Sequence, residues 1–175
     1  ILDGIRRWVE IETPTESPEQ VNKLATVVAD GYRDLPVTIE RIAGHGGCGD
    51  HLVARSSWGR EAPGILVLSH LDTVHPLGFI ERLPFRIEGD SAFGPGIYDM
   101  KGGAYLAYHA FRVLSTTAEG APLGVTPLHV ADEEIGRPPS HPLLEAEGLK
   151  PKHGLVTARG PHAAAPFNAL PHVHL

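Results

Sequence analysis

One uninterrupted apolar run, GILVLS at residues 64–69, constrains the fold of this chain more than any other sequence feature. Six residues are typical of a strand, and the run contains no polar residue before Ser69, as expected of a strand that is buried on both faces. Strands buried in this way occur mostly in parallel sheets that have helices packed on each side. The run therefore predicts a central strand of an α/β domain.

Weaker patterns on both sides of this run predict further elements. The apolar stripe of residues 1–11 predicts an amphipathic helix, and the capping sequence at residues 17–20 predicts a second helix that ends near Asp30. Strands are predicted at residues 37–42, 51–56 and 123–131, and further helices at residues 102–114 and 140–147. Because strands alternate with helices, we expect a layered α/β/α domain with a mostly parallel, mixed sheet.

Composition is typical of a globular protein and disfavours two classes of partner. Hydrophobic residues make up 42% of the 175 residues and charged residues 21%, and the length suits one domain. A net charge of −6 disfavours nucleic-acid binding, and no apolar run approaches the roughly 20 residues that cross a bilayer. Cys48 is the only cysteine, and residues 1–4 do not resemble a signal region, so we expect a cytoplasmic protein.

A polar cluster, SHLDTV at residues 69–74, follows the apolar run directly. Residues i and i+2 of an extended segment face the same side, so His70 and Asp72 are expected to lie together. A carboxylate beside a metal-binding histidine fixes its tautomer and raises its basicity, and ligands of open α/β sheets bind beyond the carboxyl ends of strands. The cluster alone is equally compatible with a capping histidine and an aspartate that forms a turn.

Two further clusters place carboxylates near strand ends or helix starts. The glycine-rich sequence GPGIYDMKGG, residues 94–103, carries Asp99, which is either a ligand or an ordinary N-cap of the next helix. The sequence ADEEIG, residues 131–136, holds three adjacent carboxylates, which repel one another unless a cation or protons neutralise them. A solvated acidic loop is the alternative. Together the three clusters offer His, Asp and Glu ligands of the kind that suits Zn²⁺, Mn²⁺ or Co²⁺.

The motifs SHLDTVHP, GPGIYDMKGG and ADEEIG resemble, in this order and approximate spacing, the signatures of a metallopeptidase family. Its members include aminoacylases, acetylornithine deacetylases, succinyl-diaminopimelate desuccinylases and glutamate carboxypeptidases, and the last branch is the most similar. The resemblance implies a zinc-exopeptidase-like fold and a metal-dependent hydrolase of amide or peptide bonds. Its substrates would be small molecules, either N-acyl amino acids or compounds with a C-terminal glutamate. The resemblance also implies that full-length members can form homodimers through a lid domain, which we expect to be absent here.

The resemblance also implies the roles of five residues. His70 would bind one metal ion, Asp99 would bridge two, and Glu134 would bind the second. Asp72 would orient His70, and Glu133 would be the general base for a metal-bridging water. The implied cofactor is a pair of Zn²⁺ ions, with Co²⁺ or Mn²⁺ as alternatives and no other cofactor. The peptide bond after Asp99 is expected to be cis.

The chain departs from the family pattern after Lys150. The resemblance implies one more carboxylate ligand on the strand after the acidic motif, but residues 154–159 are GLVTAR and no Asp or Glu follows Glu147. A distal histidine ligand of the family is also missing. We therefore expect a partial catalytic domain at residues 1–150 and a divergent or poorly ordered tail at residues 151–175.

Loss of one ligand per metal predicts weak activity or none. The tail histidines are the available substitutes, and they are His162, His172 and His174. The main alternative function is a catalytically dead fold that serves as a structural or binding module. A serine hydrolase is disfavoured because the chain has no G-x-S-x-G sequence.

Overall fold

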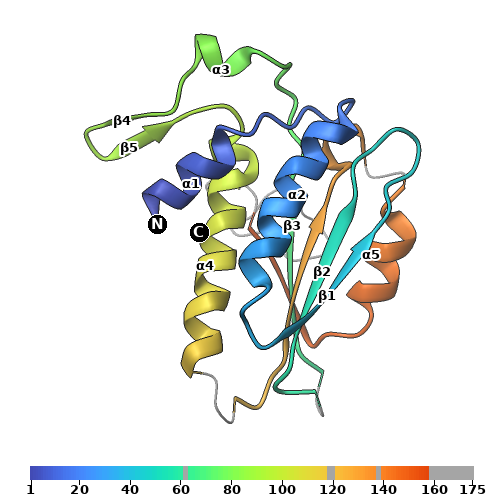
Figure 1. The fold of residues 1–175 in the computed structure, drawn as a ribbon. Coiled ribbons are helices and arrows are strands. Elements are labelled where there is room, and N and C mark those ends of the chain that lie inside the picture. The colour runs from blue at the N-terminus through green and yellow to red at the C-terminus, as the bar shows by residue number, and fades with distance from the viewer. Residues whose placement is uncertain (61–62, 118–120, 137–138, 158–175) are drawn as a thin grey trace.

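A computed structural model describes residues 1–60, 63–117, 121–136 and 139–157 of the chain, and Figure 1 shows its fold. Two helices and three strands come first, and helices and strands are interspersed after them. In chain order the elements are α1 (Leu2–Val9), α2 (Pro18–Tyr32), β1 (Val37–Ile42), β2 (His51–Ser56), β3 (Ile65–His70), α3 (Phe79–Arg82), β4 (Arg86–Glu88), β5 (Ser91–Phe93), the π-helical turn η1 (Ile97–Lys101), α4 (Gly102–Thr117), β6 (Val125–Val130), the 3₁₀ turn η2 (Glu133–Ile135), α5 (His141–Gly148) and β7 (His153–Val156).

Five strands form one mixed sheet in the order β1-β2-β6-β3-β7. The pairs β3–β6 and β3–β7 are parallel, whereas β1–β2 and β2–β6 are antiparallel. The apolar run of the sequence forms β3, which has a parallel neighbour on each side. The prediction of a mixed α/β sheet is therefore confirmed, and the parallel pair β3–β6 leads to the polar clusters at residues 69–74 and 131–136.

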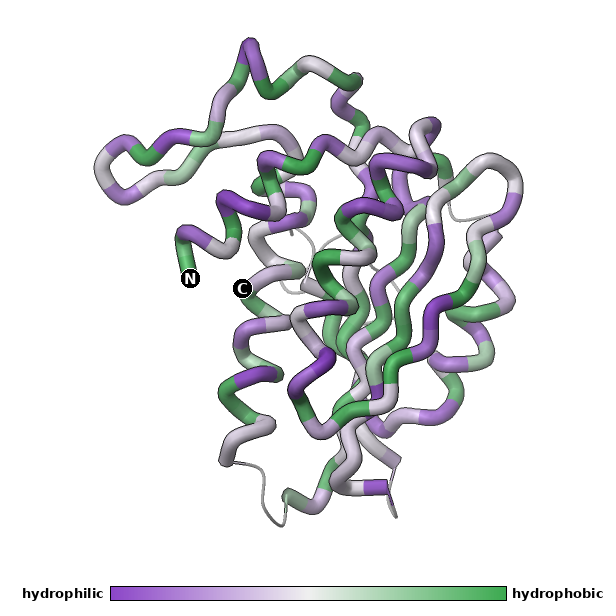
Figure 2. The backbone as a smooth tube through the Cα atoms, viewed as in Figure 1, coloured by the Kyte–Doolittle hydropathy of each residue, from purple (hydrophilic) through white to green (hydrophobic). Residues whose placement is uncertain are grey.

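Helices cover both faces of this sheet. One hydrophobic cluster joins α1, α2 and α4 to the sheet and includes Trp8, Leu24, Tyr108 and Phe111. A smaller cluster on the other side contains Val53, Leu66, Leu128 and Val130, against which Leu143 and Leu144 of α5 pack. Figure 2 shows hydrophobic residues recurring along the central strands and along α2 and α4. The layered α/β/α arrangement predicted from the sequence is thus confirmed.

Most predicted elements lie close to their expected positions, with a few differences. Strands β1 and β2 coincide with the predicted ranges, and α4 continues three residues beyond the predicted end, to Thr117. Helix α2 begins at Pro18 as predicted, but the side chain of Ser17 makes no capping hydrogen bond, so the predicted capping box does not form. The sequence did not predict α3 or the β4–β5 hairpin, which project together away from the sheet (Figure 1).

The sheet continues past the predicted domain boundary at Lys150, because β7 pairs with β3 from Ile65 to Leu68. The boundary itself and the tail stay predictions, since residues 158–175 lie outside the described part of the chain. The three tail histidines proposed as substitute ligands lie there too. Over the described ranges, none of the helices has the length and apolar character needed to cross a membrane.

Candidate metal centre

The three predicted metal ligands come from three different segments that meet at one edge of the sheet. His70 is the last residue of β3, and it lies in register with Val130, the last residue of the parallel strand β6. Glu134 lies in η2, which follows β6, and Asp99 lies in η1 just before α4. The carboxyl ends of two parallel strands therefore place His70 and Glu134 side by side, and the glycine-rich turn brings Asp99 to them.

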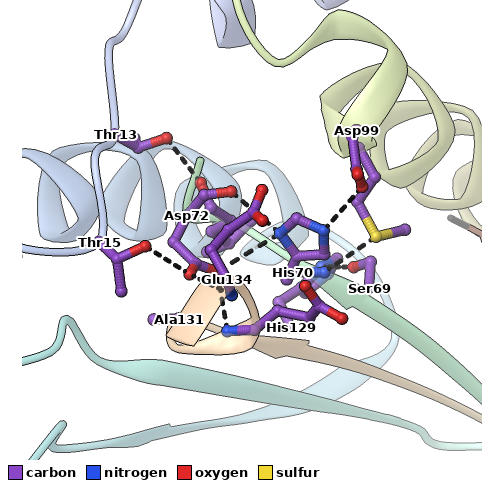
Figure 3. A network of polar contacts seen from close by, with 12 residues as sticks. Thr13, Thr15, Ser69, His70, Asp72, Asp99, His129, Ala131 and Glu134 are labelled. Atoms are coloured by element: carbon purple, nitrogen blue, oxygen red, sulfur yellow. Dashed lines mark hydrogen bonds and ion pairs between the residues drawn. The ribbon is translucent and has the colours of Figure 1, made fainter. Parts of the chain in front are cut away.

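The ligand atoms of His70, Asp99 and Glu134 all lie within 4.8 Å of one another. Nε2 of His70 is 3.1 Å from Oδ1 of Asp99 (Figure 3). Two ligands held about 2 Å from one tetrahedral zinc ion lie about 3.3 Å apart, so this separation is close to that of two zinc ligands. One imidazole nitrogen and two carboxylates also form a ligand set that suits Zn²⁺, Co²⁺ or Mn²⁺. The residues present therefore fit a divalent metal.

Asp72 orients the ring of His70, mainly through its backbone. Nδ1 of His70 donates to the carbonyl oxygen of Asp72 at 2.9 Å, and the carboxylate Oδ1 of Asp72 lies 3.4 Å from the same nitrogen. These contacts leave Nε2 directed at Asp99. Burial disfavours the charged imidazolium, but the hydrogen bonds to Asp72 and Asp99 outweigh it and raise the pKa of His70 to about 10.

The carboxylate of Asp72 is fully buried and is surrounded by donors from three segments. Its Oδ2 accepts hydrogen bonds from the hydroxyl of Thr15 at 2.8 Å and from the amide of Glu134 at 3.1 Å. Its Oδ1 accepts a hydrogen bond from the amide of Glu133 at 3.3 Å. Burial raises the pKa of this carboxyl. The hydrogen bond and ion pair with His70, and the hydrogen bonds from Glu134 and Thr15, lower the pKa by more than burial raises it, so the net shift is downward. Asp72 is therefore a buried anion that joins the β3 loop to η2.

The two glutamates of the acidic motif lie beside this anion. Burial raises the pKa of Glu134, His70 opposes that shift, and the neighbouring carboxylates of Asp99, Asp72 and Glu133 raise the pKa further. Glu133 is also close enough to His70 to stabilise its protonated form. The motif therefore concentrates negative charge, which a divalent cation would neutralise.

The loop that carries Asp99 has the backbone implied by the family resemblance. The Asp99–Met100 peptide bond is cis, and the turn begins at Gly96, whose φ of +64° is in the left-handed region that glycine accommodates best. Asp99 lies inside this turn, three residues before Gly102, the first residue of α4. Lys101 of the same motif is buried, and its Nζ donates to the carbonyl oxygen of Ile11 at 2.6 Å, which ties the loop to the segment after α1.

The structure therefore brings all five predicted site residues to one place, and it adds one that the sequence analysis missed. Thr15 contacts Asp72 from a segment 57 residues earlier in the chain. Its only sequence signal is the Thr13-Pro14-Thr15 sequence, which predicts the end of a helix rather than a contact with the site. At the carboxyl end of β7, beside β3, the described chain ends in Thr157, so no carboxylate from this strand joins the centre within the described residues.

A second buried histidine lies behind the metal centre in β6 (Figure 3). Nδ1 of His129 is 2.5 Å from the hydroxyl oxygen of Ser69, and Nε2 is 3.2 Å from the hydroxyl oxygen of Tyr32. Burial lowers the pKa of His129 to about 4. This histidine is therefore neutral at pH 7 and joins α2, β3 and β6 by uncharged hydrogen bonds.

Known proteins resemble the chain in sequence and in fold. Carboxypeptidase G2 from Pseudomonas sp. (strain RS-16) is 33% identical over 137 residues, which are 78% of this chain and 33% of that protein. Succinyl-diaminopimelate desuccinylase from Corynebacterium glutamicum is 29% identical over 114 residues, which are 65% of this chain and 28% of that protein. The chain thus spans about a third of the length of these relatives.

The crystal structure of human carnosine dipeptidase 1 matches with a TM-score of 0.72 at 14% identity, over 89% of this chain and 41% of that one. At this identity the match shows the fold alone. A sequence profile of peptidase family M20/M25/M40 matches residues 66–170, which is more than half of the chain and includes all three polar motifs. The chain belongs to peptidase family M20/M25/M40.

Proposed function

We propose that this chain forms the metal-binding part of a metal-dependent hydrolase that cleaves amide bonds in N-acyl amino acids or in peptides with a C-terminal glutamate. The observation that carries the proposal is the convergence of His70, Asp99 and Glu134, whose ligand atoms lie within 4.8 Å of one another. The names of the two curated relatives, a carboxypeptidase and a desuccinylase, support substrates of this class.

In this proposal His70, Asp99 and Glu134 would hold a pair of zinc ions, with Co²⁺ or Mn²⁺ as alternatives. A divalent metal bound here would polarise the amide carbonyl of the substrate and make an attacking water more acidic. Asp72 keeps the ring of His70 in place, because Nδ1 of His70 is engaged by the Asp72 carbonyl. Nε2 is thereby kept available as the ligand atom.

Glu133 is the proposed general base. It is adjacent to Glu134 in η2, its amide is fixed by Asp72, and its negative charge acts on His70 at the same edge of the sheet. It would accept the proton of the attacking water and return it to the leaving nitrogen. A positioned carboxylate of this kind accelerates such reactions by about 10²–10⁴-fold.

Turnover by the 175-residue chain alone is expected to be low. In the described residues three side chains form the ligand cluster, and β7 adds no carboxylate to it. Changes outside the direct ligands of a metal typically cost about 10–100-fold in affinity or activity, and a missing direct ligand should cost more. We also propose that residues 1–150 carry the catalytic part, as the position of all five site residues supports.

The metal site is tested by titrating the purified chain with Co²⁺ and following its absorption spectrum. Wild type should bind more tightly than His70→Asn, because that variant lacks the only imidazole of the ligand cluster. His141→Asn is the matched control, since His141 is an exposed residue of α5. Equal cobalt affinity in wild type and His70→Asn would contradict the metal site and would favour a structural module.

The role of Glu133 is tested with a hydrolysis assay on N-acyl amino acids and glutamyl amides at saturating Zn²⁺. Glu133→Gln should remove the turnover that wild type shows and leave cobalt affinity unchanged, whereas the exposed Glu145→Gln should change neither. Turnover that survives Glu133→Gln would show that another group is the base. Equal, negligible rates in metal-loaded wild type and Glu133→Gln would support a catalytically dead fold.

A further inference from the structure

The segment Thr13-Pro14-Thr15, between α1 and α2, runs beside the loop that follows β3. The amide of Thr73 donates to the carbonyl of Thr13 at 2.8 Å, and the amide of Thr15 donates to the carbonyl of Thr73 at 3.3 Å. Pro14 and Thr73 form a parallel β-bridge. The hydroxyl of Thr13 adds a bond to the carbonyl of Leu71 at 2.7 Å. The segment therefore acts as a short extra strand along the loop that contains Asp72.

This pairing delivers one hydroxyl to the buried carboxylate. Thr15 is 5% exposed, and its Oγ1 donates to Oδ2 of Asp72 at 2.8 Å (Figure 3). The amides of Glu133 and Glu134 and the ring of His70 also surround this carboxylate. All three groups belong to the two segments that carry His70 and Glu134, which are proposed metal ligands. Thr15 is the side chain that reaches Asp72 from a segment without any proposed ligand.

We propose that Thr15 is a positioning residue for the metal centre, acting through Asp72. Its hydroxyl fixes the orientation of the Asp72 carboxylate, and that carboxylate in turn holds the backbone of Glu133 and Glu134 and stands against Nδ1 of His70. A hydrogen bond to a buried charged group is among the stronger ones in proteins, so its loss would free the carboxylate to rotate. The consequence for metal affinity rests on the proposed function, whereas the effect on His70 does not.

Three variants separate positioning from simple stability. Thr15→Val keeps the shape of the side chain and removes its hydroxyl donor, and Thr15→Ser restores the donor. Thr13→Val is the matched control, because Thr13 is also buried and also loses one hydroxyl bond, but that bond goes to the Leu71 carbonyl and not to Asp72. Both valine variants should lower Tm, and Thr15→Val should lower it more, because its lost hydrogen bond goes to a charged carboxylate.

The first measurement is the Co²⁺ affinity of the full chain, followed by absorption. Thr15→Val should bind cobalt about 10–100-fold more weakly than wild type, the range for residues that orient metal ligands. Thr15→Ser should recover most of that affinity, and Thr13→Val should retain it. Equal losses of affinity in Thr15→Val and Thr13→Val would overturn the proposal, because both would then act through stability alone.

The second measurement uses the metal-free chain and the ring ¹⁵N resonances of His70, identified by their loss in His70→Asn. These resonances should move in Thr15→Val and stay in place in Thr15→Ser and Thr13→Val. If wild type binds no cobalt, the proposed function fails, and the His70 resonances alone decide the role of Thr15. Unchanged His70 resonances in Thr15→Val would overturn that role.

Discussion

Lowering the pH from 7 to 4 should destabilise this protein through His129, a histidine that the metal centre does not use. Its ring is 1% exposed and lies between the hydroxyls of Ser69 and Tyr32. Burial lowers its pKa from 6.5 to about 4 in the folded state. The unfolded chain, with its solvated imidazole, therefore binds a proton more readily than the folded protein at any pH between these two values.

The sign and the size of the effect follow from this difference. Because the pKa of folded His129 is depressed, its contribution to stability is fully present above pH 6.5 and is lost as the pH falls toward 4. Each pKa unit is worth about 1.4 kcal/mol, so a difference of about 2.5 units lowers the free energy of unfolding by about 3 kcal/mol. For a chain of this size that loss lowers Tm by roughly 6–12 °C.

Urea unfolding of wild type and His129→Gln at several pH values between 7 and 4 measures this contribution. Glutamine can still bond to the neighbouring hydroxyls but has no proton to gain in this range. Other carboxyls and histidines titrate in both proteins, so the difference between the two curves isolates His129. Wild type should lose about 3 kcal/mol more than the variant over this range. Parallel curves would refute the reasoning, because they would mean that His129 titrates with an ordinary pKa.

Two further predictions concern the loop of Asp99 and the core. Gly96→Ala should cost about 1–3 kcal/mol in unfolding free energy, because alanine is strained at a φ of +64° and its Cβ would lie 2.5 Å from Cγ2 of Thr73. Gly78→Ala is the control and should cost less, because Gly78 has a φ of +83° but nothing lies within 4 Å of the added Cβ. Leu128→Ala should cost about 2–5 kcal/mol by the same assay, because Leu128 is 0% exposed in the core under α5, whereas partly exposed Leu106 should tolerate alanine far better.

The sequence predicted those parts of the fold whose signal is local. The run GILVLS became β3, and the β-branched stretches at residues 37–42 and 51–56 became β1 and β2, because periodicity and apolar length depend only on neighbouring residues. The β4–β5 hairpin has strands of three residues each, which is too short for a period to appear. The short strand β7 is defined by its pairing with β3, about 90 residues earlier, rather than by its own four residues.

The site was predictable to the same extent. His70, Asp99 and Glu134 stand in short motifs whose residue types indicate metal chemistry, and they converge as expected. Thr15 could not be predicted, because its contact with Asp72 joins residues 57 positions apart and depends on how α1 and α2 are placed beside the sheet. The sequence predicts a contact between the Asp72 carboxylate and His70, whereas the shorter contact of the His70 ring is with the backbone carbonyl of Asp72.

Because β6 lies between β2 and β3 in the sheet, β3 has to wait for its partner strand while the chain is being synthesised. Strands β1 and β2 form an antiparallel pair and can associate as soon as both are synthesised, but β3 has no partner until Val125–Val130 follows it. Sixty residues separate the ends of β3 and β6, so at about 5–20 residues per second β3 keeps both edges unpaired for roughly 3–12 s. An apolar strand with two open edges is prone to pair with other chains. Nascent chains should therefore recruit chaperones during this interval, and a metal ion can be captured only after it ends.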